Sequence, residues 1–195
     1  MRRRLRWILL LLGLVAAPLY VYVYVRSHPL VFMKAHAHCI KWAGLELLNY
    51  AEAHEGRFPY HPKGYGNALL LMDEDCYQAL TGPGYDAAPF WEAKRTGKEL
   101  SEEDCGRVYI QGLTLKSNHE IAFLFDKLST PGGDHRHLPA RVWAPLTREV
   151  LLVGGIHINV RESEWPEFTE KQIELLVQEG FPREEAERLF ASKPK

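Results

Sequence analysis

The stretch REVLLVGGIHINV, residues 148–160, holds the clearest strand-pairing signal in the chain. Two apolar runs flank the glycine pair Gly154-Gly155, and in the second run polar His157 and Asn159 alternate with aliphatic residues. Glycine adopts the positive φ angles of tight hairpin turns, and this alternation is typical of a strand with one wet face. We therefore predict an antiparallel hairpin with strands at 148–153 and 156–160.

Segments on both sides of this hairpin extend the pattern to an α+β fold. Upstream, residues 107–115 and 120–126 are rich in β-branched, aliphatic and aromatic residues, which predicts two more strands. Further upstream, residues 30–54 carry apolar residues at spacings of three and four, which predicts a long helix. Residues 164–195 are expected to form a C-terminal helical tail. The expected architecture is a long helix on a small antiparallel sheet of about four strands.

The segment between the predicted helix and the first strand, residues 57–102, is rich in proline and glycine, which favours turns. Short helices are expected at 68–72 and 77–80. Its tyrosines, Phe and Trp are more typical of a core than of a ligand-binding platform. We expect partner contacts on the loops at 59–106 and 127–147, because rigid scaffolds commonly display function on loops.

The N-terminus predicts a membrane anchor. Nineteen uncharged residues lie between Arg6 and Arg26. As a helix they would extend about 28 Å, close to the thickness of a bilayer's hydrocarbon core. A signal peptide cleaved near Ala16-Ala17 is the alternative interpretation.

The arginines that precede this run favour a cytoplasmic N-terminus and an exported body. The expected organisation is a basic cytoplasmic tail at 1–6, a transmembrane helix at 7–26, an exported domain at 27–163 and the helical tail at 164–195. This organisation predicts a single-pass protein of the cytoplasmic (inner) membrane.

The charge distribution argues against nucleic-acid binding. The 195-residue chain has 24 basic and 25 acidic side chains, but five arginines and no acidic residue precede residue 27. The rest of the chain therefore carries 19 basic and 25 acidic groups, a net charge of −6. A nucleic-acid-binding protein needs a basic face to neutralise phosphates, so no nucleic-acid partner is expected.

Three strings resemble the type IV pilin and type II secretion pseudopilin-like group. The predicted long helix closes with YAEAHEGRFP, residues 50–59, which is similar to that group's string at the same place. The hairpin at 152–160 resembles the group's closing hairpin in shape, and PGGDH, residues 131–135, is similar to the loop before it. The chain departs from true prepilins, since its hydrophobic run has neither a Gly-Phe cleavage site nor a glutamate.

This resemblance implies that the anchor helix continues into the exported helix. It also implies a structural or protein-binding role rather than an enzymatic one, in secretion or envelope assembly. The implied partner is another protein or further copies of the chain, and no cofactor is expected.

A second resemblance lies in the tail, where Leu175–Ala186 is similar to the first loop of ubiquitin-associated domains. In that family a Gly-Phe turn between two short helices binds a partner. Helix chemistry alone accounts for the same string, because Gly180 stops one helix and Pro182 begins the next.

The chain has three cysteines, Cys39, Cys76 and Cys105. An exported domain folds in an oxidising compartment, where cysteines pair. Bridging Cys76 to Cys105 would close a loop of about 30 residues around the irregular segment, worth on the order of 3–4 kcal/mol. We predict this disulfide. Cys39 would then be a small buried hydrophobe, an intermolecular partner or a thiol nucleophile beside His36 or His38.

A histidine-rich loop offers the alternative function. Asp134, His135 and His137 are candidate metal ligands, because one carboxylate with two imidazoles suits a transition metal better than calcium. His61 or His157 could complete such a site. The alternative is therefore an exported metal-dependent enzyme built on this loop, or a thiol enzyme built on the third cysteine. A solvated polar loop without a metal is the simpler interpretation.

Overall fold

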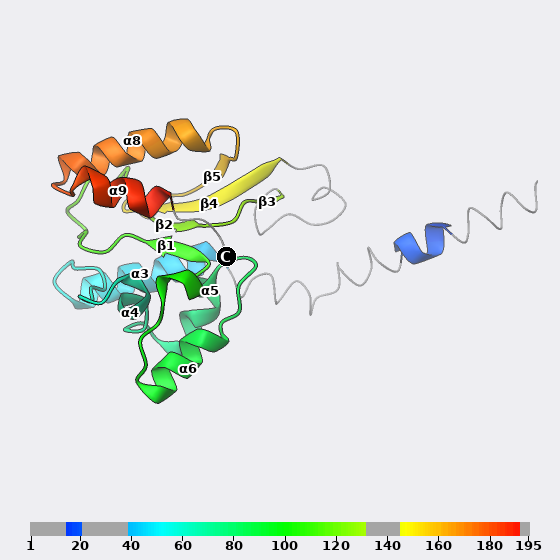
Figure 1. Ribbon diagram of the computed structural model, residues 1–195, viewed down its shortest axis with the longest axis horizontal. Coiled ribbons are helices and arrows are strands. Elements are labelled where there is room, and N and C mark those ends of the chain that lie inside the picture. Colours follow the sequence, from blue (N-terminus) through cyan, green and yellow to red (C-terminus); the bar gives the residue numbers. More distant parts are fainter. Residues whose placement is uncertain (1–14, 21–38, 132–144, 192–195) are drawn as a thin grey trace, which may run out of the picture.

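A computed structural model of the protein describes residues 15–20, 39–131 and 145–191. The chain forms three layers, with an antiparallel sheet between two layers of helices (Figure 1). The strands are β1 Arg107–Tyr109, β2 Ala122–Asp126, β3 Thr130–Pro131, β4 Leu146–Leu152 and β5 His157–Arg161. The helices are α3 Ile40–Ala53, α4 Tyr65–Leu69, α5 Tyr77–Thr81, α6 Ala88–Thr96, α8 Trp165–Gln178 and α9 Arg183–Phe190, with 3-10 turns at η1 Glu74–Cys76 and η2 Glu102–Asp104.

Strand β4 is the centre of the sheet. It pairs with β2 and then β3 along one edge and with β5 along the other, while β1 pairs with the outer edge of β2. The predicted hairpin is confirmed, with β4 and β5 in register from Thr147↔Arg161 to Leu151↔His157. The turn covers residues 153–156 instead of the predicted 154–155. Within it, Gly155 donates its N–H to the Leu152 carbonyl and takes a positive φ of 76°.

A bulge in β2 decides which face each of its aromatic residues occupies. The register with β4 shifts between Ala122 and Leu124, so regular alternation is interrupted at Phe123. Phe123 packs against Phe58, with ring centroids 4.7 Å apart, on the α3 side of the sheet. Phe125, two residues later, stacks on Phe190 of α9 instead. Each face of the sheet therefore receives one phenylalanine from the same strand.

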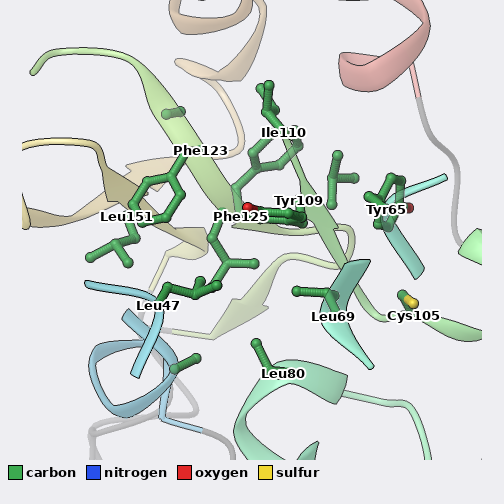
Figure 2. Close-up of a cluster of buried hydrophobic side chains, with 14 of the residues drawn as sticks. Leu47, Tyr65, Leu69, Leu80, Cys105, Tyr109, Ile110, Phe123, Phe125 and Leu151 are labelled. Carbon is green, nitrogen blue, oxygen red and sulfur yellow. The ribbon is translucent and has the colours of Figure 1, made fainter. Parts of the chain in front are cut away.

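Helix α3 lies very close to the sheet. A Cβ atom built on Gly44 would come within 2.3 Å of Leu151 Cδ2, so with a side chain at this position either Leu151 or the helix would have to shift. Buried Leu47 packs in the same core as Leu151 and Phe123 (Figure 2). The other buried positions of α3 follow the predicted spacing of three and four and carry small or aliphatic residues: Ile40, Ala43 and Ala51.

Helices α8 and α9 cover the opposite face of the sheet (Figure 1). The Phe125 ring lies 5.6 Å from Trp165 and 4.7 Å from Phe190, measured between centroids. Buried Gln172 accepts from the Ala122 N–H at 2.8 Å and donates to the Glu120 carbonyl at 3.1 Å, which satisfies the backbone beside the β2 bulge. The C-terminal tail is thus a layer of the core.

The turn that resembles a ubiquitin-associated loop packs on this protein's own body. Phe181 is half-buried, and its ring lies 3.6 Å from the position that a Cβ on Gly112 would occupy. The ring therefore contacts the loop that follows β1.

Two expectations about the architecture were wrong. Within the part of the chain that the structure describes, no helix is both long and apolar enough to cross a membrane, against the predicted transmembrane helix and single-pass inner-membrane location. Spanning needs about 20 helical residues, whereas the described helical residues of the predicted span 7–26 are 15–20, and the rest of that span lies outside the description. The sheet also has five strands instead of four, because β3 pairs with β4.

The irregular middle segment is more ordered than its composition predicts. Short helices form near both expected places, and α6 is an addition whose first turn contains proline, as helix starts allow. Tyr65, Tyr77 and Phe90 are buried, as predicted for core residues, whereas Tyr60 and Trp91 are exposed, so that prediction holds for only part of the set.

Replacing Gly44 by valine tests the close approach of α3. We expect the free energy of unfolding to fall by about 1–3 kcal/mol, because the added side chain overpacks against Leu151. Asn49→Val is the control for a valine in this helix. Asn49 is exposed on α3, and asparagine and valine have similar helix propensities. Equal unfolding free energies of the two variants by urea denaturation would contradict this packing.

Replacing Phe190 by alanine tests whether the tail belongs to the core. Phe190 is 6% exposed and stacked on Phe125, so we expect a loss of about 3–5 kcal/mol in unfolding free energy. A loss of a few tenths of a kcal/mol would mean that α9 is only loosely attached. Calorimetry or chemical denaturation measures the difference.

Candidate functional site

Three charged side chains from three adjacent strands are buried together beneath α3. Arg107 on β1 is 0% exposed, and Asp126 on β2 and Glu149 on β4 are each 1% exposed. The Arg107 Nε donates to Asp126 Oδ1 at 2.8 Å, and its Nη2 lies 3.8 Å from Glu149 Oε2. Asp126 Oδ2 accepts from the Glu149 backbone N–H at 3.2 Å. The cluster thus ties β1, β2 and β4 together at one end of the sheet.

Burial dominates the electrostatics of this cluster. Desolvation raises the pKa of Asp126 to about 6, since the lowering effect of the Arg107 guanidinium is smaller and nearby Glu149 raises the pKa further. A carboxyl group in this position therefore titrates near neutral pH although it is paired with an arginine.

His157 connects the buried cluster to the surface. Its Nε2 lies 3.5 Å from Glu149 Oε1, and its side chain is 11% exposed. The cross-strand register explains the contact, because His157 is paired with Leu151 on β5 and Glu149 lies two residues along β4 on the same face. His157 also lines a hollow at the surface.

This hollow has a volume of about 350 Å³ and lies between α3 and the β4–β5 hairpin. Helix α3 lines it with Lys41, Gly44, Leu45 and Leu48, and the hairpin contributes Leu151, Gly155 and His157. The lining is thus mainly aliphatic and includes one ammonium group, from Lys41, and one imidazole, from His157. Volumes of this size are at the lower end of those of small-ligand pockets.

Three large apolar side chains on the two elements that line the hollow remain exposed to solvent, and of these Leu45 lines the hollow itself. On α3, Trp42 is 49% and Leu45 is 50% exposed, and on the hairpin Ile156 is 59% exposed. Exposed apolar residues that gather around a concavity mark an interaction surface more often than scattered ones do. We call this surface, defined by Trp42, Leu45, Ile156 and the hollow, the α3–hairpin face.

The predicted metal ligands Asp134, His135 and His137 lie outside the described residues, as do His36 and His38. Where the structure does describe the chain, it brings no three His, Cys, Asp or Glu side chains together in a way that could hold a metal ion.

The structure describes the two histidines that could complete the predicted metal site. His61 Nδ1 accepts from the Lys63 backbone N–H at 3.2 Å. His157 Nε2 lies 3.5 Å from Glu149 Oε1.

Cys76 and Cys105 are thiols in this structure. Cys76 Sγ donates to the Asp73 carbonyl at 2.8 Å, and Cys105 Sγ lies 3.6 Å from the Ser101 carbonyl. Desolvation raises the pKa of both thiols to about 12, so neither is a thiolate near neutral pH. Their disulfide stays a prediction for protein folded under oxidising conditions. Cys39 is at the N-cap position of α3.

Sequence reasoning missed both the buried charges and the hollow. Arg107, Asp126 and Glu149 lie far apart in the sequence and belong to no recognisable motif. The alternation of His157 and Asn159 with aliphatic residues was the one available signal, since it placed His157 on the less buried face of its strand.

Asp126→Asn tests the buried cluster through pH. The pKa of Asp126 in the folded protein is about 6, above the value of about 3.9 in an unfolded chain. The folded protein holds the Asp126 proton more tightly than the unfolded chain does. This contribution to the unfolding free energy is therefore fully present below about pH 3.9 and is lost as the pH rises through about 6. The unfolding free energy of the wild-type protein should thus fall between pH 4 and pH 7 by up to about 3 kcal/mol more than that of Asp126→Asn.

The comparison uses urea denaturation across that pH range. Asp75→Asn, a change at an exposed aspartate, is the control and should follow the wild-type curve. Parallel curves for the wild type and Asp126→Asn would contradict the raised pKa.

No protein family model matches the chain, and searches of curated proteins and of solved structures likewise find no significant match.

Proposed function

We propose that the chain is a non-enzymatic protein-binding domain and that the α3–hairpin face is its contact surface. The observation that carries the proposal is a hollow whose apolar wall includes half-exposed Leu45, on elements that also leave Trp42 and Ile156 exposed. Leaving such residues in water costs free energy that a partner recovers by covering them.

The composition of the surface favours a protein as the occupant. Tryptophan and large aliphatic residues are typical of the desolvated centre of protein interfaces, where an anchor side chain from one partner fills a pocket on the other. The hollow offers such a pocket, with Leu45, Leu48 and Leu151 as its aliphatic walls. The partner would therefore insert an apolar side chain between α3 and the hairpin.

A structural or binding role is also what the resemblance to pilins and pseudopilins implies, and that kinship stays a prediction. The enzymatic alternative has less support at this surface. Among the described residues that line the hollow, His157 has no serine, threonine or cysteine beside it to act as a nucleophile.

Site-specific photo-crosslinking tests the proposal directly. A photoreactive amino acid in place of Trp42 or Ile156 in the full chain should form a discrete adduct in producing cells, with one protein identified by mass spectrometry. The purified partner should form the same adduct in vitro. A photoreactive residue at Glu170 is the matched control, because Glu170 is exposed on α8 in the opposite layer.

A second substitution tests whether apolar contact drives the binding. Leu45→Asp, combined with the photoreactive residue at 156, should remove the adduct, because it replaces an apolar wall of the hollow by a strongly hydrated carboxylate. Adducts that form equally from residue 170, or that survive Leu45→Asp, would contradict the proposal.

A further inference from the structure

We infer that the hollow on the α3–hairpin face recognises a carboxylate carried next to an apolar side chain of the partner protein. The inference rests on the proposed function and specifies the chemistry of the segment that is bound. Three features carry it: the charges around the hollow, its aliphatic walls and the placement of His157.

Positive potential converges on the hollow from α3. Lys41 lies in the first turn of the helix and lines the hollow, whereas none of the described lining residues is acidic. The first turn of α3 holds no acidic side chain that would offset the charge of the ammonium group.

The aliphatic walls specify what the carboxylate must be attached to. Leu45 and Leu48 on α3 face the hollow together with Leu151 on β4, and the volume of about 350 Å³ leaves room for a side chain of leucine size with its carboxylate. An inorganic anion would leave these walls in water. A partner segment with an apolar residue beside an aspartate, a glutamate or its own C-terminus satisfies both parts of the hollow.

His157 offers a bound carboxylate a second polar contact beside Lys41. In the described part of the chain, the charged groups that face it are Glu149 from β4, 3.5 Å from Nε2, and Lys41 from α3 across the hollow. A carboxylate bound in the hollow would place the imidazole between two carboxylates.

Hexanoate and hexanamide are matched probes of this chemistry, because they share an apolar chain and differ in charge. In proton–nitrogen NMR titrations of the full-length protein near pH 6.5, hexanoate should shift the amide signals of Lys41, Leu45, Leu151 and His157. Hexanamide should bind about tenfold more weakly, because it loses the charge-assisted hydrogen bonds.

Lys41→Gln should weaken hexanoate binding about threefold and leave hexanamide unchanged, as expected for a solvent-exposed ionic contact. Lys98→Gln is the matched control, because Lys98 is an exposed lysine that does not line the hollow. Equal affinities for the two probes, shifts at other sites, or no shifts at all would overturn the inference.

Failure of this inference is distinguishable from failure of the proposed function. If adducts from residues 42 and 156 persist while hexanoate does not bind, the face contacts a protein through apolar side chains alone. If hexanoate binds as described and no adduct forms, the hollow serves a free small carboxylate and the proposed protein contact is wrong.

Discussion

The close approach of α3 to β4 at Gly44 is the constraint on which the rest of the structure depends. Because glycine has no side chain, the helix axis comes near enough for Leu151 to occupy the space where a Cβ would be. This contact brings the inward face of α3 onto the sheet and sets the distance between the helix and the β4–β5 hairpin. The width of the hollow, and the positions of Lys41 and His157 on its two sides, follow from that distance.

Beneath the hollow, the buried Arg107, Asp126 and Glu149 give the sheet an unusual polar centre. Burying charge costs free energy that pairing only partly returns, and a well-packed apolar set would often be as stable. What the charges add is a defined geometry. They link three strands to one another, and through Glu149 they hold one edge of the His157 ring. The same arrangement can therefore support the strand register and orient the one imidazole that faces the hollow.

The parts of this fold that follow from local chemistry could be predicted, and the parts that depend on distant contacts could not. The Gly154-Gly155 turn and the spacing of apolar residues along α3 are local signals, and both elements are present. The two-residue strand β3 exists only through pairing with β4, so it has no local signal. Arg107 lies 19 residues before Asp126, and Asp126 lies 23 residues before Glu149. Only the register of the strands brings these three charges together. The charge-free run 7–25 is also a local signal, yet no described helix is long and apolar enough to cross a membrane.

Native-state hydrogen exchange is the most direct test of the central claim that α3 and the sheet form one rigid base for the binding face. If they do, the amides of Ala43, Leu47 and Val150, all buried, should exchange only through global unfolding and report the same free energy as denaturation. Exchange of the α3 amides several kcal/mol more easily than that of Val150 would contradict the account. The helix would then open while the sheet stays folded, and the hollow would not be preformed.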